Sequence, residues 1–141
     1  MRIHQLPAPA GKPWEENYKA IAATFFKDLL QVEVPVLEID CAHRVGVKRD
    51  GTQSMLVKVF RRDIVETILS KKKLLKEKKT KFVIHEDSTL PNRKLINRLH
   101  NHEEIERAWL SRGTFWAVTK SEKKLKFDLY DDIAKRISDL P

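Results

Sequence analysis

The sequence predicts an α+β protein, with a ferredoxin-like four-stranded sheet followed by a small α/β C-terminal domain. Apolar residues alternate in several short stretches, as in half-buried strands, and recur every three or four residues between them, as in amphipathic helices. The first six elements follow the order β-α-β-β-α-β, which packs two helices on one face of an antiparallel sheet. A chain of 141 residues suits one domain or two small ones. We therefore expect an RNA-recognition-motif-like domain at 1–87 and a C-terminal domain at 88–141.

The first strand and the first helix occupy the N-terminal part of the chain. Residues 2–6 predict a short strand, because the prolines and the glycine of 7–11 break the pattern there. A helix over 14–31 should follow, with Pro13 in its first turn. Its apolar positions form one stripe that we expect to lie in the core, at Trp14, Tyr18, Ile21, Phe25 and Leu29.

Two alternating stretches then predict a hairpin, formed by strands at 36–45 and 54–60. An Asp-Gly pair lies in the turn between them. On the first of these strands, Arg44 should face the open side of the sheet. The residues with the opposite parity, which should face the core, are Leu37, Ile39, Cys41, Met55, Val57 and Val59.

A second helix and a fourth strand complete the first unit. Asp63 and Glu66 have the spacing of a capping box, so a helix is expected at 63–72. Residues 81–86 read as the fourth strand.

The second unit should contain a helix, a hairpin and a short helix. Thr89 can cap a helix over 90–110, in which Leu95, Leu99, Ile105 and Trp109 are apolar, and Arg112-Gly113 should end it. The stretches TFWAVT and KLKFDL read as strands joined at 120–123, and a short helix follows them. Because this unit has few apolar residues for a core, we expect it to depend on packing against the first unit for its stability.

All of the net charge lies in the middle of the chain. Residues 51–100 contain 13 Lys and Arg against 5 Asp and Glu, whereas the segments on either side sum to zero. A concentrated positive field attracts polyanions, so nucleic acid is the expected partner. The candidate phosphate-binding lysines are Lys71, Lys72, Lys73, Lys76, Lys78 and Lys79, with Lys81 just beyond them. Lysines also stabilise a helix C-terminus without any ligand, and that reading stays open.

Three further groups are candidates for nucleic-acid contacts. Arg44 and Lys58 should lie on the open face of the sheet, where Phe60 is the one aromatic candidate for stacking. The helix that begins at 90 carries Arg93 and Lys94 near its start and Arg98 four to five residues further on. The C-terminal hairpin carries Trp116 and Lys120, a combination that suits single strands. Trp116 could instead belong to the core beside Phe115.

Other classes of function have little support in the sequence. No phosphate-loop or nucleophile-elbow glycine pattern occurs, and two histidines at 100 and 102 point apart on a helix, so we expect no enzyme, no metal site and no cofactor. One cysteine excludes an internal disulfide and suits an intracellular compartment. No apolar run is long enough to span a membrane. The chain starts inside a strand, which suggests a piece of a longer protein.

Several motifs together resemble one known family. AHRVG at 42–46, LVKVFRRD at 56–63, HEDSTLPNRKL at 85–95 and TFWAVTKSEKKLKF at 114–127 occur in this order. Their order and spacing resemble the RNA-binding part of the first-open-reading-frame proteins of LINE-type retrotransposons, sometimes labelled the transposase 22 family. The pattern is similar to that of the baculovirus few-polyhedra protein as well.

The resemblance implies a nonspecific single-stranded RNA-binding protein and nucleic-acid chaperone, which clamps its ligand between the two domains within cytoplasmic or nuclear ribonucleoprotein particles. It also implies trimerisation through a coiled coil outside these residues. In this comparison the family's basic residues correspond to Arg44, Arg93 and Lys94, and its hairpin aromatic to Trp116, where vertebrate members more often have a Tyr-Pro pair. RNA-versus-DNA preference stays open. The alternative is a protein-interaction module that binds a partner on the open sheet face.

Overall fold

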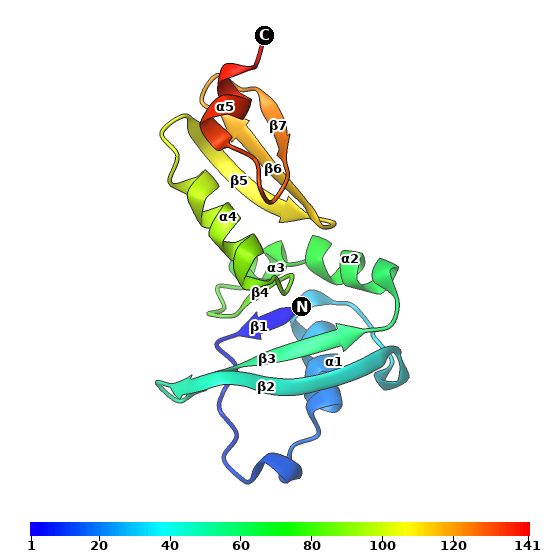
Figure 1. The fold of residues 1–141 in the computed structure, drawn as a ribbon. Helices are drawn as coiled ribbons and strands as arrows, with labels where there is room; N and C mark the ends of the chain where they lie inside the picture. The colour runs from blue at the N-terminus through cyan, green and yellow to red at the C-terminus, as the bar shows by residue number, and fades with distance from the viewer. The chain divides into compact units, whose positions relative to one another are not determined.

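The computed structural model describes all 141 residues and divides into two units, Met1–Asp87 and Ser88–Pro141. Each unit is a sheet with helices on one face (Figure 1). Residues 86–89, which belong to no helix or strand, connect the two. No helix has the length and apolar character needed to cross a bilayer.

The first unit is built on a four-stranded antiparallel sheet. Its strands are β1 (Arg2–His4), β2 (Ile39–Arg49), β3 (Thr52–Val59) and β4 (Val83–His85), in the spatial order β2-β3-β1-β4. The two long strands form the predicted hairpin. Asp50 and Gly51 close it with φ angles of 50° and 73°, the left-handed region that a tight two-residue turn requires.

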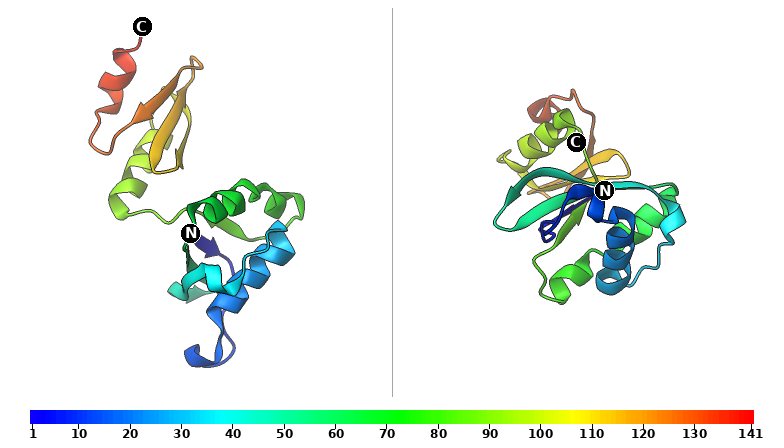
Figure 2. Two further views of the ribbon diagram at one scale, coloured as in Figure 1. Left: turned by 90° about the vertical axis from the view of Figure 1, so that its right-hand side faces the viewer. Right: turned by 90° about the horizontal axis from the view of Figure 1, so that it is seen from below.

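Three helices cover one side of this sheet: α1 (Tyr18–Leu30), α2 (Arg62–Ser70) and α3 (Lys73–Glu77) (Figure 2). Their apolar side chains meet those of the strands in one core. Its fully buried members include Ile3, Phe26, Leu30, Ile39, Met55, Val57 and Ile68. The predicted inward parity of β3 is therefore confirmed.

The first helix starts later than its apolar stripe predicted. Asn17 caps α1 by accepting a hydrogen bond from the backbone N–H of Ala20, and Pro13–Glu15 form a separate 3-10 turn. Trp14 is 76% exposed, so its assignment to the core was wrong. The helix therefore begins after the polar cap Asn17, although the apolar periodicity of the sequence extends further back to Trp14.

The capping box predicted at Asp63 does not form. Arg61 is the N-cap of α2 and makes no side-chain cap, while the Asp63 carboxylate binds the Arg61 guanidinium at 2.6 Å. This pairing lowers the pKa of Asp63, mainly through the hydrogen bond from Arg61. The carboxylate is therefore engaged by a neighbouring cation and not by the helix N-terminus.

A register shift in β2 reverses the predicted faces of its later residues. Ile39 pairs with Val59, but Cys41 pairs with Lys58, so one extra residue of β2 is accommodated between them. Such a bulge switches which residues point inward. Cys41 is consequently exposed. Leu37, which lies before the strand in the 3-10 turn Val36–Glu38, is 91% exposed. Both had been assigned to the core.

The second unit has a three-stranded sheet, not a single hairpin. Its elements are α4 (Leu90–His100), β5 (Ile105–Ser111), β6 (Thr114–Thr119), β7 (Lys124–Phe127) and α5 (Ile133–Ser138). The strands are ordered β5-β6-β7. Both helices pack on one face, around a separate core that includes Leu95, Leu99, Phe115, Ala117, Leu125, Phe127 and Ile133.

The predicted helix over 90–110 is therefore wrong in its second half. The helix ends at His100, and residues 105–111 form β5. The Arg112-Gly113 pair is a hairpin turn with φ angles of 52° and 74°, not a helix stop. The four-residue steps from 95 to 99 and from 105 to 109 fit a helix, but the six-residue step between 99 and 105 does not. The segment IERAWLS does not alternate strictly, because a register shift lies between Ile105 and Arg107, so the strand lacks a clear period-two signal.

Candidate nucleic-acid interface

The lysine-rich segment of residues 71–81 is held to the core by its few apolar residues. Leu75, 3% exposed, anchors the short helix α3, while the lysines around it point away from the core. All seven lysines of this segment are exposed, and none forms an ion pair. One of them, Lys78, donates a hydrogen bond from Nζ to the backbone carbonyl of Asp28 at 3.0 Å. Their charges are thus available to a ligand.

Arg44 does not lie on the open face of the sheet. It pairs across the hairpin with Met55, whose side chain is fully buried, and directly opposite residues share a face. Its guanidinium is bound by both carboxylate oxygens of Glu16, at 2.8 and 3.2 Å, and by the Gln53 carbonyl at 3.0 Å. With a side chain only 9% exposed, Arg44 fastens the segment before α1 to the hairpin. The expectation of an open-face arginine was wrong because of the bulge in β2.

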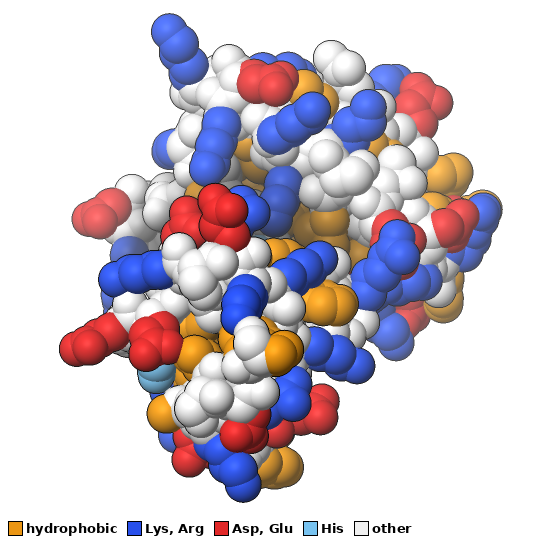
Figure 3. Space-filling model, turned by 90° about the horizontal axis from the view of Figure 1, so that it is seen from above, with side chains coloured by type: hydrophobic (Ala, Val, Ile, Leu, Met, Phe, Trp, Pro, Cys, Tyr) orange, Lys and Arg blue, Asp and Glu red, His pale blue; other side chains and the backbone are white.

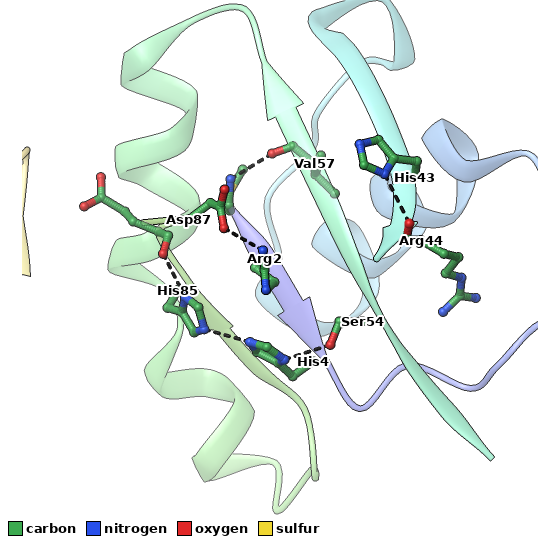
Figure 4. Close-up of polar contacts among 10 residues, drawn as sticks. Arg2, His4, His43, Arg44, Ser54, Val57, His85 and Asp87 are labelled. Atoms are coloured by element: carbon green, nitrogen blue, oxygen red, sulfur yellow. Dashed lines mark hydrogen bonds and ion pairs between the residues drawn. The ribbon is translucent and has the colours of Figure 1, made fainter. Parts of the chain in front are cut away.

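The open face of the first sheet carries a chain of histidines (Figure 4). His85 Nδ1 lies 2.7 Å from the Glu86 carbonyl and must donate to it, and in the neutral form of the ring Nε2 then carries the lone pair. His4 Nε2 donates to that nitrogen over 2.7 Å, and His4 Nδ1 accepts from the Ser54 hydroxyl at 2.8 Å. Burial lowers the pKa of His4, and the nearby His85 and Arg2 lower it further. The lowered pKa keeps the His4 ring neutral at physiological pH.

The two remaining sequence candidates on this face are exposed. Lys58 forms an ion pair with Asp40 at 2.8 Å, which raises the pKa of the lysine through their hydrogen bond. Phe60 follows β3 and is 64% exposed, so it is not packed under neighbouring side chains. Lys58 is already neutralised in part, and Phe60 is an isolated aromatic. Of the two surfaces, the lysine segment therefore has more cationic groups without an acidic partner.

In the second unit, the basic residues of α4 face solvent. The side chain of Thr89 caps the helix by accepting from the Asn92 N–H, and Leu95 and Leu99 turn inward. Arg93 and Lys94 are exposed and form no ion pair. Arg98 is also exposed, with one long hydrogen bond of 3.5 Å to the Asp131 carbonyl.

Trp116 belongs to the sheet face that α4 and α5 leave free. Its cross-strand partner on β5 is Trp109, and its partner on β7 is Lys126. Neither tryptophan is part of either core, and each is partly buried. Lys124 places its ammonium 4.4 Å from the ring centroid of Trp116 and 5.6 Å from that of Trp109. We call Arg107, Trp109, Trp116, Lys124 and Lys126 the tryptophan face.

Sequence reasoning missed the two residues of this face that lie on β5. Trp109 had been placed on a helix, and Arg107, whose Cζ lies 5.8 Å from the Trp109 ring, was not considered. Lys120 lies in the exposed turn between β6 and β7, adjacent to the face but without a ring contact. A correct strand assignment would have found the pair, because Trp109 and Trp116 flank the Arg112-Gly113 turn symmetrically.

The predicted residues are divided between the two units and, within the second unit, between the two sides of its sheet. The lysine segment belongs to the first unit, and Trp116 lies on the opposite side of the second-unit sheet from α4 with Arg93, Lys94 and Arg98. Viewed from above, basic side chains are spread over the surface and interspersed with apolar ones (Figure 3). No group of three or more His, Cys, Asp or Glu side chains is arranged to hold a metal ion. No protein-family model, curated protein or solved structure matches this chain.

Proposed function

We propose that this chain is a nonspecific binding module for single-stranded RNA, with single-stranded DNA as an alternative ligand, and that it acts as a nucleic-acid chaperone without enzymatic activity. The observation that carries the proposal is the set of seven lysines in residues 71–81, all exposed and none paired with an acid. Phosphate contacts of this kind supply affinity without reading sequence. The basic residues of α4 add a second phosphate-binding surface.

The fold supports the same proposal. The strand order β2-β3-β1-β4, with helices on one face, agrees with the ferredoxin-like plan of RNA-recognition motifs. The usual mode of these domains stacks bases on sheet aromatics, but this sheet face carries histidines and lacks paired aromatics. We therefore assign nucleic-acid binding by the first unit to its lysine segment and not to the open face of its sheet.

The order of sequence motifs supports a cellular context. We propose that the module belongs to a ribonucleoprotein of a LINE-type retrotransposon, in the cytoplasm or the nucleus, and that it self-associates through a coiled coil outside these 141 residues. Chaperone action follows from many weak phosphate contacts, because each can exchange without release of the whole strand.

The test compares two triple variants with the same change in charge. One replaces Lys72, Lys73 and Lys76 of the lysine segment by glutamine. The other replaces exposed, unpaired lysines elsewhere, at positions 12, 48 and 135. Affinity for a fluorescent single-stranded RNA is measured between 50 and 200 mM salt. Each phosphate contact contributes about 0.7 to the slope of log affinity against log salt, so the segment variant should lower the slope by about 2.

Four phosphate contacts in the wild-type chain would lower affinity about 50-fold over this range of salt. The control variant should keep most of the slope. Equal losses in the two variants would mean that the lysine segment is no binding site. Wild-type binding that does not depend on salt would contradict an electrostatic grip and favour a protein partner on the open sheet face.

A further inference from the structure

The tryptophan face has the composition of a site for flat, unpaired rings. Trp109 and Trp116 lie directly opposite each other on β5 and β6. Val118, one row away on the same face, is buried although it belongs to neither core. The face is thus apolar at its centre, while three cations border it: Arg107, Lys124 and Lys126.

A purely structural role does not account for this arrangement. Core tryptophans pack against other apolar side chains, yet the apolar residues of both helices of this unit gather on the opposite side of the sheet. What lies over the two indoles is the ammonium of Lys124, with Arg107 beside Trp109. None of the three cations forms an ion pair.

We propose that the tryptophan face binds the unpaired bases of a single-stranded nucleic acid and makes the chain selective for single over double strands. The inference rests on the proposed function, and it adds base stacking to the electrostatic contacts as a second source of affinity for the nucleic acid. Stacking on an indole is open to any base because every base has a flat π-face, so the site adds affinity without sequence preference. Bases of a duplex are already stacked and paired, so they cannot reach the indoles.

Lys124 is the group that an incoming base displaces. A cation–π contact at an exposed site is weaker than base stacking on an aromatic ring. The lysine stem is flexible, so its ammonium can leave the ring and bind the phosphate beside the stacked base. Arg107 and Lys126, at the two edges of the face, are placed to bind the phosphates on either side.

The experiment uses the whole chain and separates stacking from charge. The variant Trp109→Leu/Trp116→Leu keeps apolar side chains but removes the flat rings, and Trp109→Phe/Trp116→Phe restores rings. Trp14→Leu is the matched control, since Trp14 also carries a lysine, Lys12, at 5.2 Å but is strongly exposed in the first unit. The probes are a labelled oligouridine and an RNA duplex of equal length, each titrated at several salt concentrations between 50 and 200 mM.

We expect the double leucine variant to bind the single strand at least ten-fold more weakly, with duplex affinity and salt slope unchanged. The phenylalanine variant should recover part of the loss, and Trp14→Leu should bind as the wild type does. Single-strand binding should also quench the intrinsic fluorescence of the wild-type chain, a readout that needs no variant to fold.

Four results would overturn the inference. A folded double leucine variant with wild-type single-strand selectivity would remove the tryptophan face from binding. Absence of fluorescence quenching on saturation with oligouridine would do the same. If the wild type binds neither probe, the proposed function fails along with this inference. Salt-dependent binding with equal affinity for both strand types refutes only the stacking site.

Discussion

Replacement of Arg44 by methionine should destabilise the first unit and leave nucleic-acid affinity unchanged. The side chains of Arg44 and Glu16 are 9% and 15% exposed, and the arginine makes three hydrogen bonds. Removal of one partner from a buried pair typically costs about 3–5 kcal/mol, since the other charge stays uncompensated. Water still reaches part of Glu16, so we expect the free energy of unfolding to fall by about 2–3 kcal/mol. For a unit of this size, that lowers Tm by about 10–15 °C.

The assay is urea unfolding followed by the amide NMR signals of β3 and, separately, of β6. The β6 signals serve as an internal control, because they report the other unit. The double variant Arg44→Met/Glu16→Leu should recover much of the loss, since no unpaired charge remains. RNA affinity is then compared at a temperature where both proteins are folded. A variant with wild-type stability but strongly reduced affinity would refute this reasoning and return Arg44 to the binding surface.

Two further outcomes follow from the first unit. The pKa of His4 is lowered in the folded state, so below about pH 6.5 the unfolded chain binds more protons than the folded chain does. The free energy of unfolding should therefore decline as the pH falls from about 6.5 towards the pKa of folded His4. A series of Tm values against pH should show this decline, and His4→Gln should reduce it. Phe26 is fully buried between α1 and the sheet, so Phe26→Ala should cost about 3–5 kcal/mol in urea unfolding of this unit; a loss below 1 kcal/mol would mean that the core closes around the missing ring.

The alternation of apolar residues was sufficient to predict most strands, but not the side on which each residue lies. The parity of β3 was correct because its ladder is regular. The bulge after Ile39 cannot be recognised from the amino-acid sequence. It turned Cys41 towards solvent and Arg44 towards the helix side of the sheet, the reverse of the predicted faces. Pairing partners therefore determine the faces of a strand, and a single sequence does not contain them.

The candidate site was predictable to the extent that it depends on charge. The lysine segment was identified because its residues are close together in the sequence. Its exposure was predictable because so many charged side chains are not buried together. The tryptophan face joins two strands, so its residues come together only when β5 is recognised as a strand. Apolar residues four apart in this region suggested a helix, and that assignment concealed the pairing of Trp109 with Trp116.

The connection between the units is short, and this has a consequence for avidity. Only residues 86–88 lie between the end of β4 and Thr89, the cap of α4. Under the proposed function, a strand released by one unit remains near the other at an effective concentration of about millimolar. The two weak sites then act as one bivalent binder, and the nucleic acid can dissociate from one unit while it stays bound to the other. Such stepwise release lets a bound transcript change its base pairing while the protein stays attached.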